Sequence, residues 1–598
     1  MSVRSDARER AGESETGMQT GWMTDWTPSA RWPHYTRSNA GEVLPTPVSP
    51  LGQTFTWEHG ICRGWADGYV RTGYFTADEF DEEHPGVCGF FGGFFYINLS
   101  NVRMQGVRSP GLTVEQLDLA IFGDHPDVPA YRAHPDDERP ELVPGIVEHM
   151  GWVMSTTTWP EIDNEKVATR ALRADRPDLA GLSDVELVAM ARATQPMLRK
   201  LFDSHTVSSS SSAIGPGILH AIGQAIGDPT IPMKLVAGIG EVDSAEPSFA
   251  MWEMSRVVRG SEELTAAFDA GVGRLLDRLR ESDGADAVAF LDRLDAFLAE
   301  FGSRGPNEWE ISADTWETRP EIALAAIDRV RLQVDAESPH RRQAEHAATR
   351  ERVTAEVRAL VLSLGDELAG QFEAAIAASH QLAFRERTKT NIIRAVHEGR
   401  MAFRELGRRR AAVGDLAAPA HVFMLLDDEL DEFIADPTGW RTTLADRHLR
   451  WTALAELEPP YFIKDGVVPR LADYPRKGAG DVPAMAVGDV LHGVPGCAGT
   501  YRGRARVVTD AGDPGDLQPG DVLVAPLTDP AWTPLFMAAG AVVVDVGGQI
   551  SHAIIVSREL GLPCVVSATD ATRRIPNGAL IDVDGDLGTV TLIQGVQP

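Results

Sequence analysis

The residue with the clearest potential for chemistry is a histidine that follows a glycine pair and begins a helix. It lies in the segment GAVVVDVGGQISHAIIVSRELGLPCVV, residues 540–566. Residues 542–546 predict a buried strand, because a short unbroken apolar run is typical of one. Gly547 and Gly548 are predicted to allow the sharp backbone turn that follows. The predicted order is therefore strand, glycine turn, His552 and helix.

The helix that begins at His552 has recognisable start and stop signals. Ser551 is predicted as its N-cap, and Gly561 and Pro563 are predicted to end it after Leu560. Unpaired backbone N–H groups and the positive end of the helix dipole stabilise an anion at the first turn of a helix. A neutral imidazole is also nucleophilic near neutral pH. A lone histidine at a helix start is more often a capping or core residue, but a neutral imidazole at this position is also suited to carry a phosphoryl group.

Two cations in the string FRERTK form a second candidate site. Arg385 and Lys389 are four residues apart on a predicted helix, so they project from one face and repel each other unless an anion lies between them. A transferring phosphoryl group is such an anion, and fixed cations stabilise its transition state. The alternative is that Glu386 pairs with Lys389 on a solvated face. Arg558, by contrast, is predicted to face a partner or a carboxylate rather than the phosphate.

Three further segments each allow two interpretations. The run VSSSSSA, 207–213, predicts a flexible loop, with a serine-lined acceptor pocket as the alternative. The aromatic run 89–101 predicts core packing, with the lining of an acceptor pocket as the alternative. Within it, residues 94–98 predict a strand beside a glycine pair. Glu308 and Glu310 include a candidate general base for an acceptor hydroxyl, although a salt-bridge role is the simpler interpretation.

The first 410 residues of the chain contain three stretches of different composition. Residues 1–25 are low in hydrophobicity and rich in charge, which predicts a disordered tail. Residues 26–101 are rich in Gly, Pro and aromatic side chains, which predicts irregular structure with short strands. From about residue 112 to residue 410, apolar residues recur at spacings of three and four residues, which predicts long helices.

The last quarter of the chain has a different pattern. Residues 466–488 are rich in Pro, Gly and charge and predict an interdomain linker. Residues 489–598 have short β-favouring runs with helices near 531–539 and 552–560, which predicts a compact α/β domain. We therefore predict a multidomain protein, with a mainly α-helical acceptor-substrate domain at 26–465 followed by a compact α/β swivelling phosphohistidine domain.

Composition narrows the classes of partner and compartment. The chain has 598 residues, of which 87 are acidic and 56 basic, for a formal net charge of −31. This charge repels a phosphate backbone, so we expect no nucleic-acid partner. The beginning of the sequence lacks the apolar core of a signal peptide, and no apolar run approaches the roughly 18 residues of a membrane helix, so we expect a cytoplasmic protein without a membrane partner. Neither a disulfide framework nor a zinc site is expected from the four cysteines, which lack CxxC spacing: Cys62, Cys88, Cys497 and Cys564.

The segment around His552 resembles the phosphohistidine motif of the PEP-utilising dikinase family, in which a glycine pair precedes Ser/Thr/Cys-His and a RELG-P helix end follows. The resemblance continues upstream and covers about 110 residues. More diffusely, residues 35–51 and 301–320 resemble the substrate domain of the rifampicin phosphotransferases, and FRERTK resembles that family's Arg-Glu-x-x-Lys element. Ser303 departs from the family, in which histidine is frequent at this position.

The resemblance implies a mechanism and a partner. In this family an ATP-grasp domain transfers the β-phosphate of ATP to the histidine and releases AMP and phosphate. We find no ATP-grasp loop in the sequence, so a separate ATP-grasp subunit is implied, with ATP and Mg²⁺ bound mainly there and none bound tightly by this chain. Arg385 and Lys389 take catalytic roles beside His552, while Gly547, Gly548 and Ser551 form the phosphate loop. Substrate binding falls to three residues of the 301–320 segment: Arg304, Glu308 and Glu310.

Three hypotheses about the acceptor and the function remain open. The divided arrangement resembles phenylphosphate synthase and 4-methylphenyl phosphate synthase, which favours a small organic hydroxyl compound such as phenol or 4-cresol. The substrate domain resembles that of rifampicin phosphotransferase, which makes a rifamycin-type antibiotic the second choice. The third reading is a phosphocarrier or binding protein without catalytic turnover.

Overall fold

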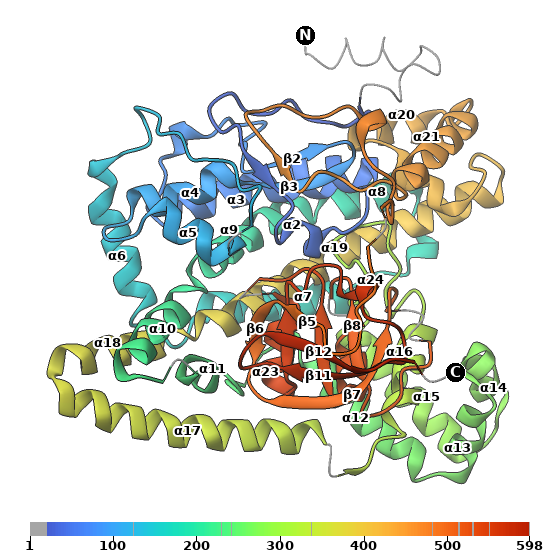
Figure 1. The fold of residues 1–598 in the computed structure, drawn as a ribbon. Helices are drawn as coiled ribbons and strands as arrows, with labels where there is room; N and C mark the ends of the chain where they lie inside the picture. Colours follow the sequence, from blue (N-terminus) through green and yellow to red (C-terminus); the bar gives the residue numbers. More distant parts are fainter. Residues whose placement is uncertain are drawn as a thin grey trace.

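The structure is a computed structural model that describes residues 21–596 apart from 124, 229, 241, 336–337, 481, 512–514, 529–531 and 549–550. Residues 1–20 of the predicted disordered tail lie outside the described residues. Residues 21–25, predicted as part of this tail, are packed instead: Trp22 is buried, and the Asp25 carboxylate accepts a hydrogen bond from the Gly93 backbone N–H at 2.8 Å. The chain forms a helical body with a small sheet, followed by a C-terminal α/β unit (Figure 1).

The small sheet joins the beginning of the chain to residues that lie more than 350 positions later. Its strands are antiparallel in the order β2-β3-β1-β4, with bounds Cys88–Phe91, Phe94–Asn98, Tyr35–Thr36 and Phe462–Ile463. Gly92 and Gly93 form the tight turn between β2 and β3, and both have the positive φ that such a turn requires. The predicted strand in the aromatic run is therefore confirmed as β3, and most of the run is buried core.

A long helix occupies part of the stretch that we predicted as irregular. It begins as a π-helix, η2 (Gly52–Ile61), and continues as α3 (Cys62–Arg71). Its glycines are the reason that the prediction was wrong, because they serve close packing rather than turns. A Cβ atom on Gly64 would lie 2.0 Å from the Arg199 carbonyl oxygen, and one on Gly68 would lie 2.5 Å from Thr206 Cβ. Both neighbours belong to α9, which α3 therefore approaches closely.

The predicted helical body is confirmed. Its central element is α19 (Gln381–Ala412), which is buried along most of its length and packs against α7, α8 and α9. The other helices, in chain order, are α2 (Ala40–Val43), α4 (Leu99–Arg108), α5 (Val114–Phe122), α6 (Val143–Val153), α7 (Pro160–Ala174), α8 (Asp184–Arg192), α9 (Gln195–Ser211), α10 (Ile214–Ile226), α11 (Ile231–Leu235), α12 (Glu246–Arg259), α13 (Glu262–Asp269), α14 (Leu275–Glu281), α15 (Ala285–Phe301), α16 (Glu321–Val330), α17 (Pro339–Leu364), α18 (Asp366–Ala378), α20 (Leu430–Ala435) and α21 (Trp440–Leu454).

The serine run is helical, which corrects the prediction of a flexible loop. Most of it forms the C-terminal part of α9. Its hydroxyl groups bond back to carbonyl oxygens of the same helix: Ser208 Oγ to His205 O at 3.1 Å and Ser211 Oγ to Val207 O at 2.8 Å. These local bonds satisfy the polar groups inside a buried helix, so the serines need no solvent.

The C-terminal unit is an α/β domain, as predicted. Its sheet has the order β5-β12-β11-β7-β8-β9-β10-β6, in which β7, β8, β9 and β10 are parallel neighbours. The strands are β5 (Val490–His492), β6 (Val494–Cys497), β7 (Thr500–Val507), β8 (Val522–Ala525), β9 (Ala541–Val544), β10 (Cys564–Val566), β11 (Leu580–Asp584) and β12 (Thr589–Gln594). The helices are α22 (Thr533–Ala538), α23 (His552–Leu560) and α24 (Ala571–Arg574).

The stretch 466–488, predicted as a linker, has two parts. Up to Lys477 it packs on the small sheet: Leu471 and Tyr474 are buried in one cluster with Trp22, and the Lys477 N–H donates to the Glu456 carbonyl oxygen at 2.8 Å. Residues 478–480, 483 and 484 are exposed, and Met485 is buried against the C-terminal domain.

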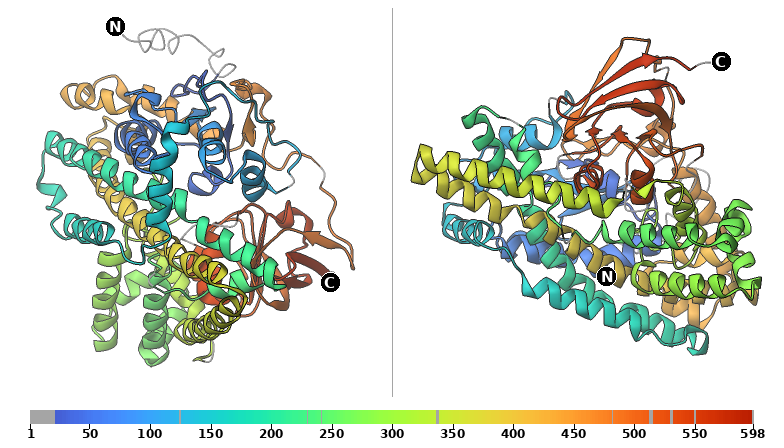
Figure 2. Two further views of the ribbon diagram at one scale, coloured as in Figure 1. Left: turned by 90° about the vertical axis from the view of Figure 1, so that its left-hand side faces the viewer. Right: turned by 90° about the horizontal axis from the view of Figure 1, so that it is seen from below.

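The α/β domain is docked on the helical body. Trp252 of α12 and Val330 of α16 belong to the same apolar cluster as residues of α22. The Glu559 carboxylate of α23 accepts a hydrogen bond from the Ile239 N–H at 3.2 Å, and Gln333 donates to the Met537 carbonyl oxygen. Figure 2 shows the red domain lying against the green and yellow helices in two further directions. This docking places α23 at the junction of the two units.

None of the helices in the described parts of the chain is long and apolar enough to cross a membrane.

The packing of the linker stretch is testable by substitution. Leu471→Ala removes buried side-chain volume, so we expect the free energy of unfolding to fall by about 2–4 kcal/mol. Val467→Ala is the control, because Val467 is 69% exposed and its truncation is expected to change stability by less than about 0.5 kcal/mol. Urea unfolding followed by tryptophan fluorescence measures both. Equal midpoints for the two variants would show that this stretch is a free linker.

Candidate functional site

His552 is the first residue of α23 and lies at the junction of the α/β domain and the helical body. Its ring nitrogens face two hydroxyl groups, Nε2 with Thr533 Oγ1 at 3.1 Å and Nδ1 with Thr528 Oγ1 at 3.2 Å. The side chain is buried, and this burial lowers the pKa of His552 well below its usual value. The imidazole is therefore neutral at pH 7 and keeps a lone pair on one nitrogen.

The helix of His552 has the predicted bounds, but its N-terminus differs in detail. Ser551 is at the N-cap position with φ −68° and ψ 156°, and Gly561 ends the helix in the left-handed conformation. The Ser551 hydroxyl makes no capping bond and is buried without a hydrogen-bond partner among the described residues. Neither Gly547 nor Gly548 has a positive φ, so the expected glycine-specific turn is not formed at these two residues.

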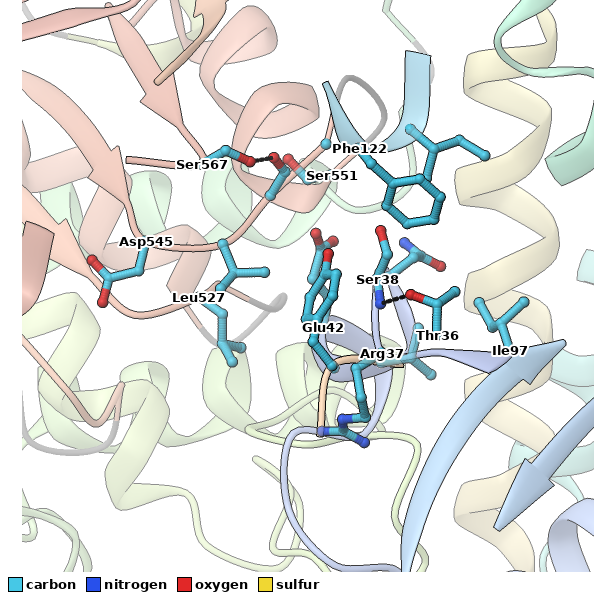
Figure 3. Close-up of a pocket in the computed structure, with 18 of the residues that line it drawn as sticks. Thr36, Arg37, Ser38, Glu42, Ile97, Phe122, Leu527, Asp545, Ser551 and Ser567 are labelled. Carbon is cyan, nitrogen blue, oxygen red and sulfur yellow. Dashed lines mark hydrogen bonds between the residues drawn. The ribbon is translucent and has the colours of Figure 1, made fainter. Parts of the chain in front are cut away.

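The glycine pair has a spatial role instead. A Cβ atom on Gly547 would lie 3.1 Å from both Ser551 Oγ and Val566 Cβ, so a side chain there would crowd the start of α23. The Gly547 carbonyl oxygen accepts a hydrogen bond from Ser567 Oγ at 2.6 Å, which ties this loop to the segment after β10 (Figure 3). Gly548 has open space at the position of a Cβ, and its backbone N–H belongs to the site.

Three cations of the helical body lie close enough to His552 to affect its pKa. Lys389, Arg304 and Arg385 each lower the pKa of His552 further after the dominant effect of burial. Arg385 and Lys389 lie on α19, as the helical spacing predicted, while Arg304 lies in the segment after α15. The structure therefore brings together the histidine and three of the cationic residues that the sequence singled out. The alternative of a solvated face is wrong, because Arg385 is buried and Lys389 is only 13% exposed.

Two of these cations keep open hydrogen-bond donors. Arg304 donates from Nε to Glu308 Oε2 and from Nη1 to Thr390 Oγ1, both at 2.8 Å. Its Nη2 is buried without a partner among the described residues, as is Nε of Arg385. A buried guanidinium with an unsatisfied N–H is unfavourable unless an acceptor binds there. The cluster is therefore suited to hold an anion beside His552.

The two candidate bases from the sequence have other partners. Glu308 lies between Arg304 and Lys389, and its Oε1 is 3.7 Å from Lys389 Nζ. This carboxylate therefore positions the cations. Glu310 accepts hydrogen bonds from Ser49 Oγ at 2.5 Å and Ser312 Oγ at 2.7 Å, so it joins the segment before η2 to its own turn.

Arg558 also differs from its prediction. Its guanidinium is buried inside the α/β domain, and its Nε donates to the Gly496 carbonyl oxygen at 3.1 Å. The residue thus links α23 to β6 instead of facing a partner or a carboxylate.

Sequence reasoning missed Glu42, whose side chain reaches from α2 to the start of α23 in the α/β domain. Its carboxylate accepts hydrogen bonds from the backbone N–H groups of Gly548 and His552, the anion-binding end of α23. Burial raises the pKa of Glu42 to about 7, although Arg385 and Lys389 oppose the shift. Figure 3 shows the side chain pointing from the small-sheet unit toward Ser551. The sequence offered no signal for this role beyond the place of Glu42 in the segment 35–51.

A cavity of about 2310 Å³ opens beside these groups. It extends from Gly547, Gly548 and Ser551 on the α/β domain, past Glu42, into the helical body. Its inner part is lined by aromatic side chains of η2, α3, β3, α9 and the segment after α15: Trp57, Trp65, Tyr69, Phe95, Phe202 and Trp309. The aromatic run 89–101 therefore contributes both to the core and, through Phe95, to the wall of this cavity.

Among the residues that the structure describes, no cluster of three or more His, Cys, Asp or Glu side chains is arranged to hold a metal ion.

Two family models match the chain, one over the α/β domain that contains His552 and one over part of the helical body that contains Arg304 and Arg385. Residues 517–588 match the PEP-utilising enzyme mobile domain, and residues 205–386 match the rifampicin phosphotransferase fourth domain. The C-terminal part of the chain is therefore similar to the mobile domain of the PEP-utilising enzymes. His552 lies in the first matched region and Arg304 and Arg385 lie in the second, while Lys389 follows directly after it.

Curated relatives match over about 60% of the chain. An uncharacterised protein of Mycobacterium tuberculosis is 34% identical over 365 residues, which are 60% of this chain and 39% of the relative. A rifampicin phosphotransferase of Streptomyces sviceus is 30% identical over 58% of this chain and 40% of its own length. A prodigiosin synthesizing transferase of Serratia marcescens is 28% identical over 60% and 40%, respectively. The chain thus spans about two fifths of the length of these relatives.

The contact of Glu42 predicts a pH-dependent docking of the mobile domain. The pKa of Glu42 is raised to about 7 in the docked state from an ordinary value of 4.5, so the docked form binds the proton more tightly. The contribution of this carboxyl to docking is fully present below pH 4.5 and is lost as the pH rises through about 7. We expect Glu42→Gln, which stays neutral, to remove this component and to dock more strongly than wild type above pH 7.

Energy transfer between dyes at the exposed positions 449 and 587 measures this docking across the pH range. The difference between wild type and Glu42→Gln isolates the titration of one group. Glu432→Gln, at an exposed carboxyl of α20, is the matched control and is expected to follow wild type. Identical curves for Glu42→Gln and wild type would contradict the assigned contact.

Proposed function

We propose that the protein is a phosphotransferase component that carries a phosphoryl group on His552 and transfers it to the hydroxyl of an organic acceptor. The observation that carries the proposal is the position of a neutral, buried histidine against Arg304, Arg385 and Lys389, with open donors on the two arginines. This is the arrangement that a phosphohistidine needs when it gives up its phosphoryl group.

The chemistry of transfer follows from this arrangement. The acceptor oxygen forms a bond to phosphorus while the N–P bond to His552 breaks, and its electron pair returns to the imidazole. Lys389 and Arg385 balance the charge on the phosphoryl oxygens during transfer. Arg304 offers its free Nη2 to the same group, and Glu308 holds Arg304 and Lys389 in place. Gly547, Gly548 and Ser551 supply the space and the backbone N–H groups at the start of α23.

The phosphoryl donor is proposed to be ATP bound by an ATP-grasp domain on a separate polypeptide, together with Mg²⁺. That domain places the β-phosphate on His552 and releases AMP and phosphate. His552 is buried at the body in the docked state, so charging requires the mobile domain to swing away. The connection from residue 478 to Met485 is the proposed hinge.

The acceptor is proposed to be an aromatic hydroxyl compound, with phenol or 4-cresol as the simplest candidates. The six aromatic side chains of the inner cavity favour a flat apolar ligand whose hydroxyl points toward the mobile domain. A rifamycin-type antibiotic is the second candidate. In its favour, the cavity exceeds the roughly 300–1,000 Å³ of sites for drug-sized ligands, and a rifampicin phosphotransferase is among the relatives.

Charging is tested with ATP that carries a radioactive β-phosphate. We expect acid-labile label on wild type but not on His552→Ala, and only when an ATP-grasp partner is present. Label on wild type without the partner would instead place the donor site on this chain. No label on wild type with a partner of proven activity would contradict the carrier role and favour a binding protein.

Transfer is tested separately from charging by removing one cation. Lys389→Met removes a positive charge that stabilises the transition state of phosphoryl transfer. We therefore expect transfer from phosphorylated His552 to the acceptor to slow by about 10²–10³-fold, while labelling of His552 persists. Arg408→Gln is the control on the same helix, because its side chain is 63% exposed and pairs with Glu405. The decay of label in the presence of phenol, 4-cresol or a rifamycin measures the rate. Transfer at the wild-type rate in Lys389→Met would remove this lysine from the mechanism.

A further inference from the structure

His205 lies in the aromatic part of the cavity and has no role in the function proposed above. It belongs to α9, is only 9% exposed and contributes to the cavity wall. Its ring lies 5.3 Å from that of Phe202 and 6.1 Å from that of Trp309, measured between centroids. It is therefore a polar group among the side chains that would hold an apolar acceptor.

The hydrogen bonds of His205 determine which ring nitrogen carries the proton. Nδ1 lies 3.0 Å from Thr388 Oγ1. The Thr388 hydroxyl donates its one hydrogen to the Arg385 carbonyl oxygen at 3.0 Å, and the Ser208 hydroxyl donates to the His205 carbonyl oxygen at 3.1 Å. Thr388 Oγ1 also lies 3.1 Å from Ser208 Oγ, and either hydroxyl could be the donor in that contact. In the arrangement in which the Thr388 hydrogen is on the Arg385 carbonyl oxygen, Thr388 Oγ1 accepts from Nδ1–H. In this tautomer the lone pair is on Nε2, the nitrogen that accepts a proton.

The same contact joins His205 to the phosphate-binding helix. Thr388 lies on α19 three residues after Arg385, a spacing that places these two side chains on one face of the helix, and it directly precedes Lys389. Burial lowers the pKa of His205 well below its usual value, and Arg385 and Lys389 lower it further. The imidazole is thus neutral at pH 7, in the presence of two cations that also lower the pKa of His552.

We propose that His205 is the general base that takes the proton from the acceptor hydroxyl, with Nε2 as the accepting atom and Thr388 as the residue that positions the ring. The proposal rests on the phosphotransferase function argued above. In the step, the acceptor O–H bond breaks as its oxygen bonds to phosphorus. The proton goes to Nε2, and the electron pair of the broken N–P bond stays on His552. The imidazolium of His205 later releases its proton to water.

Two carboxyl groups close to the phosphoryl site have other partners. Glu308 is held by Arg304 and Lys389, and Glu42 accepts from the backbone of the mobile domain. His205 has both a free lone pair and a place among the aromatic side chains, which combines proton acceptance with acceptor binding.

The test compares two acceptors of different acidity. The full chain is charged on His552 with phosphoramidate, freed of reagent and mixed with either phenol or the more acidic 4-nitrophenol. A base is needed for phenol, but much less for an acceptor that is already largely ionised. We expect His205→Gln to slow transfer to phenol by about 100-fold or more and transfer to 4-nitrophenol by less than about 10-fold. His340→Gln, at a histidine of α17 that lies outside the cavity lining and has a 51% exposed side chain, is expected to match wild type for both acceptors.

The amount of phosphohistidine formed on each variant reports whether the mobile domain and its histidine are intact. A loss of equal size with both phenols, or no loss with either, would overturn the base role while leaving the phosphotransferase function in place. If wild type holds phosphohistidine but transfers it to neither phenol, nor to a rifamycin, the proposed function fails and the base role fails with it. Thr388→Val, which removes the acceptor of Nδ1–H, is expected to reproduce the acidity-dependent loss in milder form.

Discussion

The site depends on an excess of positive charge that is buried at a domain junction. Arg304, Arg385 and Lys389 all lower the pKa of His552, and the carboxylates paired with them are Glu308 and Glu386. Burial of an unbalanced charge is unfavourable, so the cluster requires a further anion. In the unphosphorylated chain the Glu42 carboxyl lies near two of these cations and on the N–H groups of α23. A phosphoryl group on His552 has more negative charge than a carboxylate, and its oxygens can accept hydrogen bonds from N–H donors of this kind, so it fits this space.

The scaffold explains how such a cluster is held open. The two cations of α19 are on the longest helix among the described residues, which is buried along most of its length and packs against α7, α8 and α9. The π-helix η2 and the close approach of α3 to α9 bring Trp57, Trp65 and Phe202 to one cavity. Irregular helices of this kind are frequent at functional sites, where they turn side chains that a regular helix would place elsewhere. The aromatic chamber and the cation cluster therefore share the helices α9 and α19, and His205 and Thr388 connect the two.

The sequence predicted those parts of the site that depend on residues close together in the chain. The strand, loop and helix around His552 are local, and the spacing of Arg385 and Lys389 on a helix is local, so both were predictable. Glu42, His205 and the partners of Glu310 depend on packing between segments more than 150 residues apart, which no local pattern specifies. The serine run and the glycines of α3 were misread for a related reason: inside a buried helix, serine bonds to its own backbone and glycine permits close contact, whereas the same residues in an exposed segment favour loops.

The most direct measurement of the central claim is ³¹P NMR of the chain charged with phosphoramidate, because it needs no knowledge of the partner that supplies ATP. The account predicts a phosphohistidine signal in wild type that is absent in His552→Ala. On addition of an aromatic acceptor this signal is predicted to disappear while a phosphate ester signal grows. A phosphohistidine signal that decays to inorganic phosphate at the same rate with and without every acceptor would contradict the claim that the docked site performs phosphoryl transfer.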